Sequence, residues 1–321
     1  FSDRGLDERW RRASFSGLVK SAPKRRVLPE PTDGRERDGD DDPPAWERPE
    51  GVPAAERIPL WELDRNNTTG VCLHEVLELH DFRAPEGLSS LVREKLRKYG
   101  FDAERWTDTV TAALQRAIET PLLPSGLRLS DVAPGERLNE LEFLGAAAPN
   151  SPVASIGPKE LGAALAIGAE QSPFSRDYPG AVSSLRFKRV RGFLNGFIDL
   201  VFRHDGAWYV VDHKSSSLGP RQAGYGAEHI AESMAKHHYV LQYHLYLLAV
   251  HRFLQHRLGD AYAYDREAGR PQWFGGVLYL YLRGMAGADQ PGSGVYFDRP
   301  PLARVEALSQ LFANPGGGVD E

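Results

Sequence analysis

Apolar and polar positions along the chain follow a helical period first and strand periods later. Apolar residues three and four apart predict helices over about residues 70–79, 88–99 and 103–119, the last ended by Pro121. Alternation over residues 138–144 predicts a strand in which Glu140 and Glu142 share one face. A long helix is expected over about residues 228–258, with an apolar side made of Ile230, Met234, Leu241, Leu245, Leu248 and Phe253.

The clearest local pattern is a hairpin within residues 192–215. Two runs of β-branched and aromatic residues flank Asp205 and Gly206, and an Asp-Gly pair between such runs is a strong hairpin signal. A buried strand over residues 275–282 follows the long helix. Helices, a strand, a hairpin, a long helix and a further strand, in this order, predict an α/β layer fold around a mixed sheet.

Residues 21–59 interrupt these patterns, because they are rich in Pro, Gly and charged residues and have almost no apolar periodicity. They predict a flexible linker, with an acidic tail that mimics nucleic acid as the alternative. Nine acidic and three basic residues between positions 30 and 50 account for the net charge of -5, and the rest of the chain holds 36 Lys+Arg and 35 Asp+Glu. Composition therefore neither supports nor excludes DNA binding.

Cysteine usage and segment lengths limit the class of protein. The single Cys72 excludes intrachain disulfides and cysteine-based metal cages. No apolar run is long enough to cross a membrane and no secretory signal is present, so we expect a soluble, cytoplasmic protein. The first residue is Phe1, which indicates a fragment of a longer protein, and no Gly-x-x-x-x-Gly-Lys-Ser/Thr phosphate loop for ATP occurs.

Candidate chemistry concentrates on the hairpin. Asp212 and Lys214 are two apart in one strand and face the same way, and the turn brings Asp199 back toward them. An isolated Asp-x-Lys pair is usually a salt bridge on an exposed strand. Two carboxylates and an ammonium in an apolar hairpin, however, cost several kcal/mol unless partners or a metal compensate them. Such oxygen ligands suit magnesium, and the corresponding chemistry is metal-assisted phosphodiester hydrolysis.

Three stretches give these residues a family context: GFIDLVFRHDGAWYVVDHKSSSLG, LQYHLYLLAVHRFLQHRL and FGGVLYLYLRG. They resemble the RecB-type nuclease domains of RecBCD helicase-nucleases (exodeoxyribonuclease V), and the similarity extends from about Ser14 to about Phe312. The resemblance implies the restriction-endonuclease-like PD-(D/E)xK core, a mixed central sheet flanked by helices, with a helical N-terminal part. It divides the chain into the end of a preceding helicase region (1–20), the linker (21–59) and the nuclease domain (60–321).

The same resemblance implies the roles of individual residues. The metal ligands are expected to be His74, Asp199, Asp212 and the main-chain carbonyl of His213. The other site residues are expected to be the catalytic Lys214, the acidic Glu140 with Glu142 as the alternative, and Gln242 and Tyr246, which either contact the DNA backbone or brace the lysine. This chain departs from the family pattern at His213, where an aromatic residue is usual, and at Ser216, where Asn is usual.

Histidine and aromatic residues outside this pattern have simpler interpretations. An isolated histidine on an amphipathic helix is more often a core or surface residue than a ligand, and only the family match gives His74 a metal role. The segment after it lacks the second histidine of a zinc protease motif. His237, His238 and the remaining Tyr and Trp residues are interpreted as packing.

The functional expectation is an Mg2+-dependent exodeoxyribonuclease, with Mn2+ and Ca2+ as ions that the same ligands could bind. Its substrate would be single DNA strands from unwound double-strand ends, during break processing and recombinational repair. The resemblance implies RecC- and RecD-like subunits and a RecA-type recombinase as partners. The alternative is a non-catalytic module that docks partner subunits or loads the recombinase.

Overall fold

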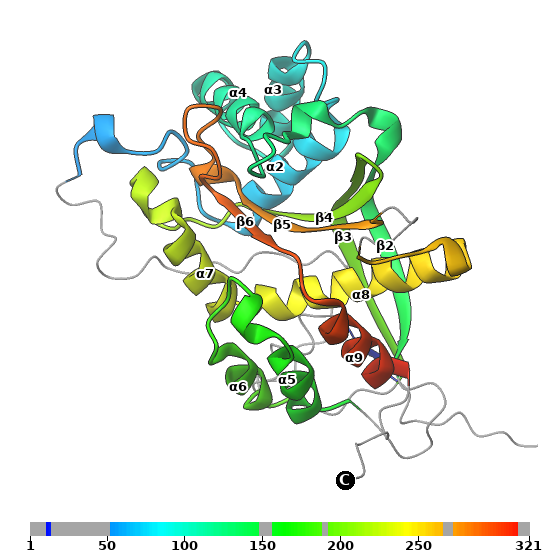
Figure 1. Ribbon diagram of the computed structural model, residues 1–321. Coiled ribbons are helices and arrows are strands. Elements are labelled where there is room, and N and C mark those ends of the chain that lie inside the picture. The colour runs from blue at the N-terminus through cyan, green and yellow to red at the C-terminus, as the bar shows by residue number, and fades with distance from the viewer. Residues whose placement is uncertain (1–10, 14–51, 148–155, 188–191, 266–271, 314–321) are drawn as a thin grey trace, which may run out of the picture.

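A computed structural model describes residues 11–13, 52–147, 156–187, 192–265 and 272–313 of the chain (Figure 1). Six strands in these residues form one mixed sheet, with helices on both of its faces. The strands are β1 (Arg11–Ala13), β2 (Arg137–Ala147), β3 (Gly192–His204), β4 (Ala207–Lys214), β5 (Phe274–Tyr281) and β6 (Val295–Asp298). The helices are α2 (Asn67–Leu79), α3 (Leu88–Lys98), α4 (Ala103–Glu119), α5 (Pro158–Ala166), α6 (Tyr178–Ser183), α7 (Ala227–Lys236), α8 (Tyr239–Leu258) and α9 (Leu302–Ala313). The predicted α/β fold with a helical N-terminal part is confirmed.

Strands β3 and β4 form the predicted hairpin. Their antiparallel pairing begins at His204 and Ala207. Asp205 and Gly206 connect them with φ of 49° and 83°, as a type I′ turn requires. This turn fixes the register, which sets Asp199 near the residues that follow Val211.

The other strands extend the sheet on both sides of the hairpin. Strand β2 pairs antiparallel with residues 192–202 of β3, and β5 pairs parallel with β4, so that Asp212 lies beside Tyr279. Strand β6 pairs antiparallel with β5. All of β5 is buried, as is β4 from Val210 to its end, because helices cover both faces at the centre of the sheet.

Each face of the sheet has its own hydrophobic core. One core joins α2, α3 and α4 to the side of the sheet that carries Leu200, Val211 and Leu278. The other core joins α5 to α9 to the opposite side, which carries Val201, Val210 and Val277. Figure 1 shows the first group of helices on one face and α8 running along the other. The sheet therefore separates the two groups of helices, and residues from both groups can meet only where two neighbouring strands move apart.

The long helix expected over residues 228–258 is in fact two helices. Helix α7 ends at Lys236, and α8 begins at Tyr239 after His238, whose φ is 56°. A non-glycine residue in this left-handed region cannot continue a right-handed helix. The apolar side was also wrong at one position, since Phe253 is 61% exposed. Leu241, Leu245 and Leu248 are buried as expected.

Two segments upstream of residue 60 also contact the domain. Arg11–Ala13 forms β1, which pairs parallel with residues 192–194 of β3. Ile58, at the end of the predicted linker, is buried and donates its main-chain N–H to Pro220. Residues 1–10 and 14–51, which include the rest of the predicted helicase end and linker, lie outside the described residues.

A buried carboxyl in β6 gives the fold a pH dependence that can be measured. Asp298 is 4% exposed and accepts a hydrogen bond from the Tyr243 hydroxyl at 2.5 Å. Burial, only partly offset by this bond and by the charge of Arg304, raises the pKa of Asp298 from its ordinary 3.8 to about 6. The folded state thus binds this proton more tightly than the unfolded state, and stability is lost as the pH rises from about 4 to 6.

Replacing Asp298 with Asn removes this contribution while keeping an acceptor for Tyr243. We expect the unfolding free energy of the Asp298→Asn variant, relative to the parent chain, to increase by about 2 kcal/mol between pH 4.5 and pH 7.5. Urea unfolding of both chains at the two pH values measures this difference. A difference that does not change with pH would show that Asp298 titrates normally.

Candidate metal centre of the β3–β4 fork

The two hairpin strands separate at the residues that carry the predicted site. Their ladder ends at Leu200 and Val211, and beyond it Asp199 Oδ2 accepts a hydrogen bond from the His213 N–H at 2.7 Å. A side chain thus takes the place of a main-chain partner where the strands part. The opening holds a pocket to which α2, β2, β3, β4 and α8 contribute. Its lining includes His74, Glu140, Asp199, Asp212, Lys214, Gln242 and Tyr246.

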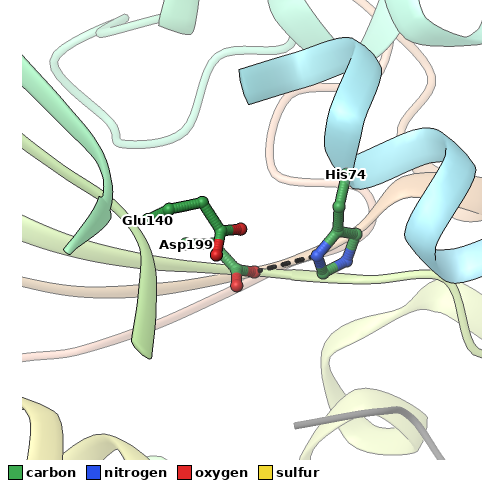
Figure 2. A group of neighbouring side chains, drawn as sticks. All are labelled: His74, Glu140 and Asp199. Carbon is green, nitrogen blue, oxygen red and sulfur yellow. Dashed lines mark ion pairs between the residues drawn. The ribbon is translucent and has the colours of Figure 1, made fainter. Parts of the chain in front are cut away.

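Three of these side chains gather in one cluster, which comprises His74, Glu140 and Asp199. Each offers one ligand atom, and these atoms lie within 4.8 Å of one another. His74 Nδ1 is 3.5 Å from Asp199 Oδ2. Figure 2 shows the imidazole and the two carboxyl groups pointing toward a common space from α2, β2 and β3. The cluster is half-buried, so solvent and a ligand can reach it.

Local structure explains why these residues meet. The Asn66 side chain accepts a hydrogen bond from the Thr69 N–H at 2.9 Å and caps the start of α2. Gly70 then lets α2 approach the end of β4, since a Cβ there would lie 3.0 Å from Ser215 Oγ. On the other side, the partners of Asn139 and Leu141 are Leu200 and Ile198, which sets Glu140 opposite Asp199.

Glu140 also has an unusual backbone conformation. Its φ is 49°, in the left-handed region that non-glycine residues rarely adopt. Strained backbone of this kind tends to occur at functional sites, where the surrounding structure holds it in place. The irregularity lies within the long β2–β3 ladder, at the position that contributes to the cluster.

Helix α2 is anchored by the residue next to His74. The Glu75 carboxylate accepts hydrogen bonds from Lys95 at 3.0 Å, Lys98 at 2.8 Å and Tyr99 at 2.6 Å, all on or just after α3. Burial opposes the ionisation of Glu75. The three hydrogen bonds together outweigh this effect and lower the pKa of Glu75 to about 2. Glu75 is therefore ionised at neutral pH and holds α2 against α3.

Asp212 and Lys214 form a buried ion pair at the other side of the pocket. Lys214 Nζ is 2.8 Å from Asp212 Oδ1, and both side chains are 5% exposed. The ammonium also lies 3.9 Å from the ring centre of Tyr239 and 5.4 Å from that of Tyr279. The opposite charge and the aromatic rings beside the ammonium offset part of the cost of burying this pair.

His213 lies between these two groups of residues. Its N–H is bound to Asp199, and its ring centre is 5.7 Å from that of His74. Burial, followed by the charges of His74 and Lys214, lowers the pKa of His213 well below its ordinary value. Its imidazole is therefore neutral at pH 7.

The donor set of the cluster fits a divalent cation. Two carboxylates and one imidazole supply oxygen and nitrogen atoms around one space, and a cation there would offset the repulsion between Glu140 and Asp199. Among the described residues Asp212 is not part of that group of three, but it lines the same pocket. A cation, an acidic cluster and a nearby ammonium are the groups that act on phosphate esters.

Comparison with known proteins gives this chemistry a family. Residues 46–284 match the model of the PD-(D/E)XK nuclease superfamily. The chain belongs to this nuclease superfamily. Its members use divalent metal ions, and the cluster of His74, Glu140 and Asp199 is the candidate metal site of this chain.

Relatives within the superfamily share much of the sequence. RecBCD enzyme subunit RecB of Escherichia coli (strain K12) is 35% identical over 252 residues, which cover 78% of this chain and 20% of that protein. RecBCD enzyme subunit RecB of Mycobacterium tuberculosis (strain ATCC 25618 / H37Rv) is 36% identical over 335 aligned residues, covering 96% of this chain and 29% of that protein. RecBCD enzyme subunit RecB of Haemophilus influenzae is 33% identical over 254 residues, which cover 79% of this chain and 19% of that protein. The chain thus spans less than a third of the length of these relatives.

The superfamily assignment can be compared with the residues expected from the sequence. The structure brings Glu140 into the cluster, whereas Glu142, the alternative, is exposed and does not line the pocket. Gln242 and Tyr246 line the pocket and are bonded to each other, Nε2 to hydroxyl, at 3.0 Å. The His213 peptide lies beside the cluster, and its carbonyl as a metal ligand stays a prediction.

Sequence reasoning did not single out two aromatic residues that contact Lys214. Tyr239 and Tyr279 were interpreted as packing and do belong to the core, and their rings also face the Lys214 ammonium. A signal for Tyr239 exists in the sequence, because Tyr239, Gln242 and Tyr246 are spaced i, i+3, i+7 on one helical face.

The described part of the chain has no helix long and apolar enough to cross a membrane.

Proposed function

We propose that this chain is the nuclease domain of a RecBCD-type helicase-nuclease. It hydrolyses phosphodiester bonds in single DNA strands that a helicase motor delivers from double-strand ends, with Mg2+ as the cation. The observation that supports this most is the single pocket that gathers His74, Glu140, Asp199, Asp212 and Lys214 at the β3–β4 fork. The similarity to RecB subunits of RecBCD enzymes supports the type of complex.

The acidic residues and His74 hold the cation in this proposal. His74 and Asp199 are ligands together with Asp212 and the main-chain carbonyl of His213, and Glu140 completes the acidic side of the site. When bound, the cation stabilises charge on the phosphate oxygens and makes water a better nucleophile. Asp199 has a second task, since its bond to the His213 N–H keeps that peptide beside the ligands.

Lys214 acts on the substrate as the catalytic cation of the chain itself. Its ammonium is held 2.8 Å from Asp212, next to the cluster and in the same pocket. From there it orients the attacking water or neutralises the scissile phosphate. A charge at a nearly dry site acts more strongly than the same charge in water.

The surroundings of this domain follow from the same proposal. RecC- and RecD-like subunits and a RecA-type recombinase are the partners, and the cytoplasm is the compartment where they meet chromosomal DNA. ATP binding and unwinding belong to a motor outside this chain, because its sequence has no phosphate loop.

The test is digestion of linear single-stranded DNA by the 321-residue chain. We expect cleavage in Mg2+, cleavage in Mn2+, and none when EDTA is present, because the phosphate charge is then uncompensated. A parallel reaction with Ca2+ measures whether binding of an ion suffices for turnover. If the DNA stays intact both in Mg2+ and in EDTA, and calorimetry detects no Mg2+ binding, the result would favour a non-catalytic docking module.

A further inference from the structure

The Lys214 ammonium lies against the faces of two tyrosine rings, Tyr239 and Tyr279, which we call the aromatic cradle. Nζ is 3.9 Å from the first ring centre and 5.4 Å from the second, and the two rings are 5.9 Å apart. We infer that Tyr239 is a positioning residue, whose ring face holds the Lys214 ammonium where it acts on the phosphate. This inference rests on the proposed catalytic role of Lys214.

An aromatic face suits this task better than a second carboxylate. The negative face of the ring attracts the cation without removing its charge or fixing the direction of its N–H groups. The ammonium is then stabilised in a nearly dry pocket, where its side chain is 5% exposed and Asp212 Oδ1 lies 2.8 Å away. A second carboxylate in the same place would neutralise the charge that the substrate phosphate needs.

The break between α7 and α8 builds the cradle. Because His238 adopts a left-handed conformation, α8 begins at Tyr239, and the ring of that first residue lies over β4. A continuous helix over residues 228–258 would give Tyr239 a different direction. The strained His238 backbone therefore has a consequence at the site.

Gln242 and Tyr246 support the second ring. The Tyr279 hydroxyl donates to Gln242 Oε1 at 2.8 Å, and Gln242 Nε2 donates to the Tyr246 hydroxyl at 3.0 Å. Gln242 and Tyr246 are 1% and 2% exposed, so these bonds form in a dry environment. Of the two roles expected from the sequence, this chain of bonds favours bracing the lysine, through Tyr279.

The first test separates the ring face from the volume of the side chain. With Mg2+ and linear single-stranded DNA, Tyr239→Phe should keep kcat within about twofold, and Tyr239→Leu should lower kcat by about tenfold with KM for DNA unchanged. Phenylalanines that carry one, two or three fluorines at position 239 keep the shape of the ring and weaken its face stepwise. We expect kcat to fall with each fluorine. Equal kcat for all ring variants and for Leu would overturn the inference.

The second test measures the contact without any nuclease activity. A double-mutant cycle compares the effect of Tyr239→Leu on the unfolding equilibrium constant in the parent chain and in Lys214→Met. We expect the effect to be about fivefold larger when Lys214 is present, because the substitution then also removes the ring face from the buried ammonium. Equal effects in both backgrounds would reduce Tyr239 to ordinary packing. If the parent chain cleaves no DNA, the proposed function fails, and this cycle still decides on the cradle.

Discussion

Replacing Asp199 with Asn is expected to lower Mg2+-dependent cleavage of single-stranded DNA by roughly 10³-fold. Asp199 belongs to the cluster and also fixes the neighbouring strand, with His74 Nδ1 at 3.5 Å and the His213 N–H at 2.7 Å. Asn keeps an oxygen for that N–H and removes the negative charge. A weakened cation site costs several kcal/mol of transition-state stabilisation, which corresponds to roughly three powers of ten in rate.

The expected loss has a specific cause that a second measurement can check. Calorimetric titration with Mg2+ or Mn2+ should show weaker binding to Asp199→Asn, whereas its thermal unfolding should stay close to that of the parent chain. Glu142→Gln is the matched control, because Glu142 is exposed, lies two residues after Glu140 and does not line the pocket. Full cleavage by Asp199→Asn, or an equal loss in Glu142→Gln, would remove Asp199 from the site.

The elements of this fold that could be predicted are those with a local cause. The hairpin follows from Asp205 and Gly206 between apolar runs, and the three helices of the N-terminal part follow from their apolar period. The position of Asp199, Asp212 and Lys214 in one pocket follows from the same turn, since one β-turn fixes the register of both strands. These predictions needed no knowledge of the rest of the chain.

The features that could not be predicted depend on distant contacts. The break at His238 has no Gly or Pro to announce it, and the His238 side chain contacts Tyr178, a residue far away in the sequence. Glu140 reaches Asp199 because β2 pairs with a strand some sixty residues later, and such pairing leaves no local signal. The addition of Arg11–Ala13 to β3 spans a still longer separation.

Removing the Asp212 carboxylate is expected to destabilise the fold as well as the activity. In Asp212→Ala the Lys214 ammonium stays buried without the carboxylate that lies 2.8 Å away, and breaking such a pair costs roughly 3–5 kcal/mol. The aromatic cradle limits this cost but does not replace an anion. Urea unfolding of Asp212→Ala and the parent chain measures the difference. Glu104→Ala is the control, since its pair with Arg97 has a similar length of 2.9 Å but side chains that are 74% and 61% exposed, and its loss should cost less than about 1 kcal/mol.

A double variant separates the cost of the charge from its use. Asp212→Leu combined with Lys214→Met fills the same buried space with apolar groups, and replacing a buried pair in this way is often neutral or stabilising by about 1–4 kcal/mol. We therefore expect the unfolding free energy of the double variant to be at least as large as that of the parent chain. We also expect the double variant to show no Mg2+-dependent cleavage. A protein that becomes more stable by losing two charges must keep them for another purpose, which here is the chemistry on the phosphate. A double variant as unstable as Asp212→Ala would instead mean that the ion pair itself holds the β3–β4 fork together.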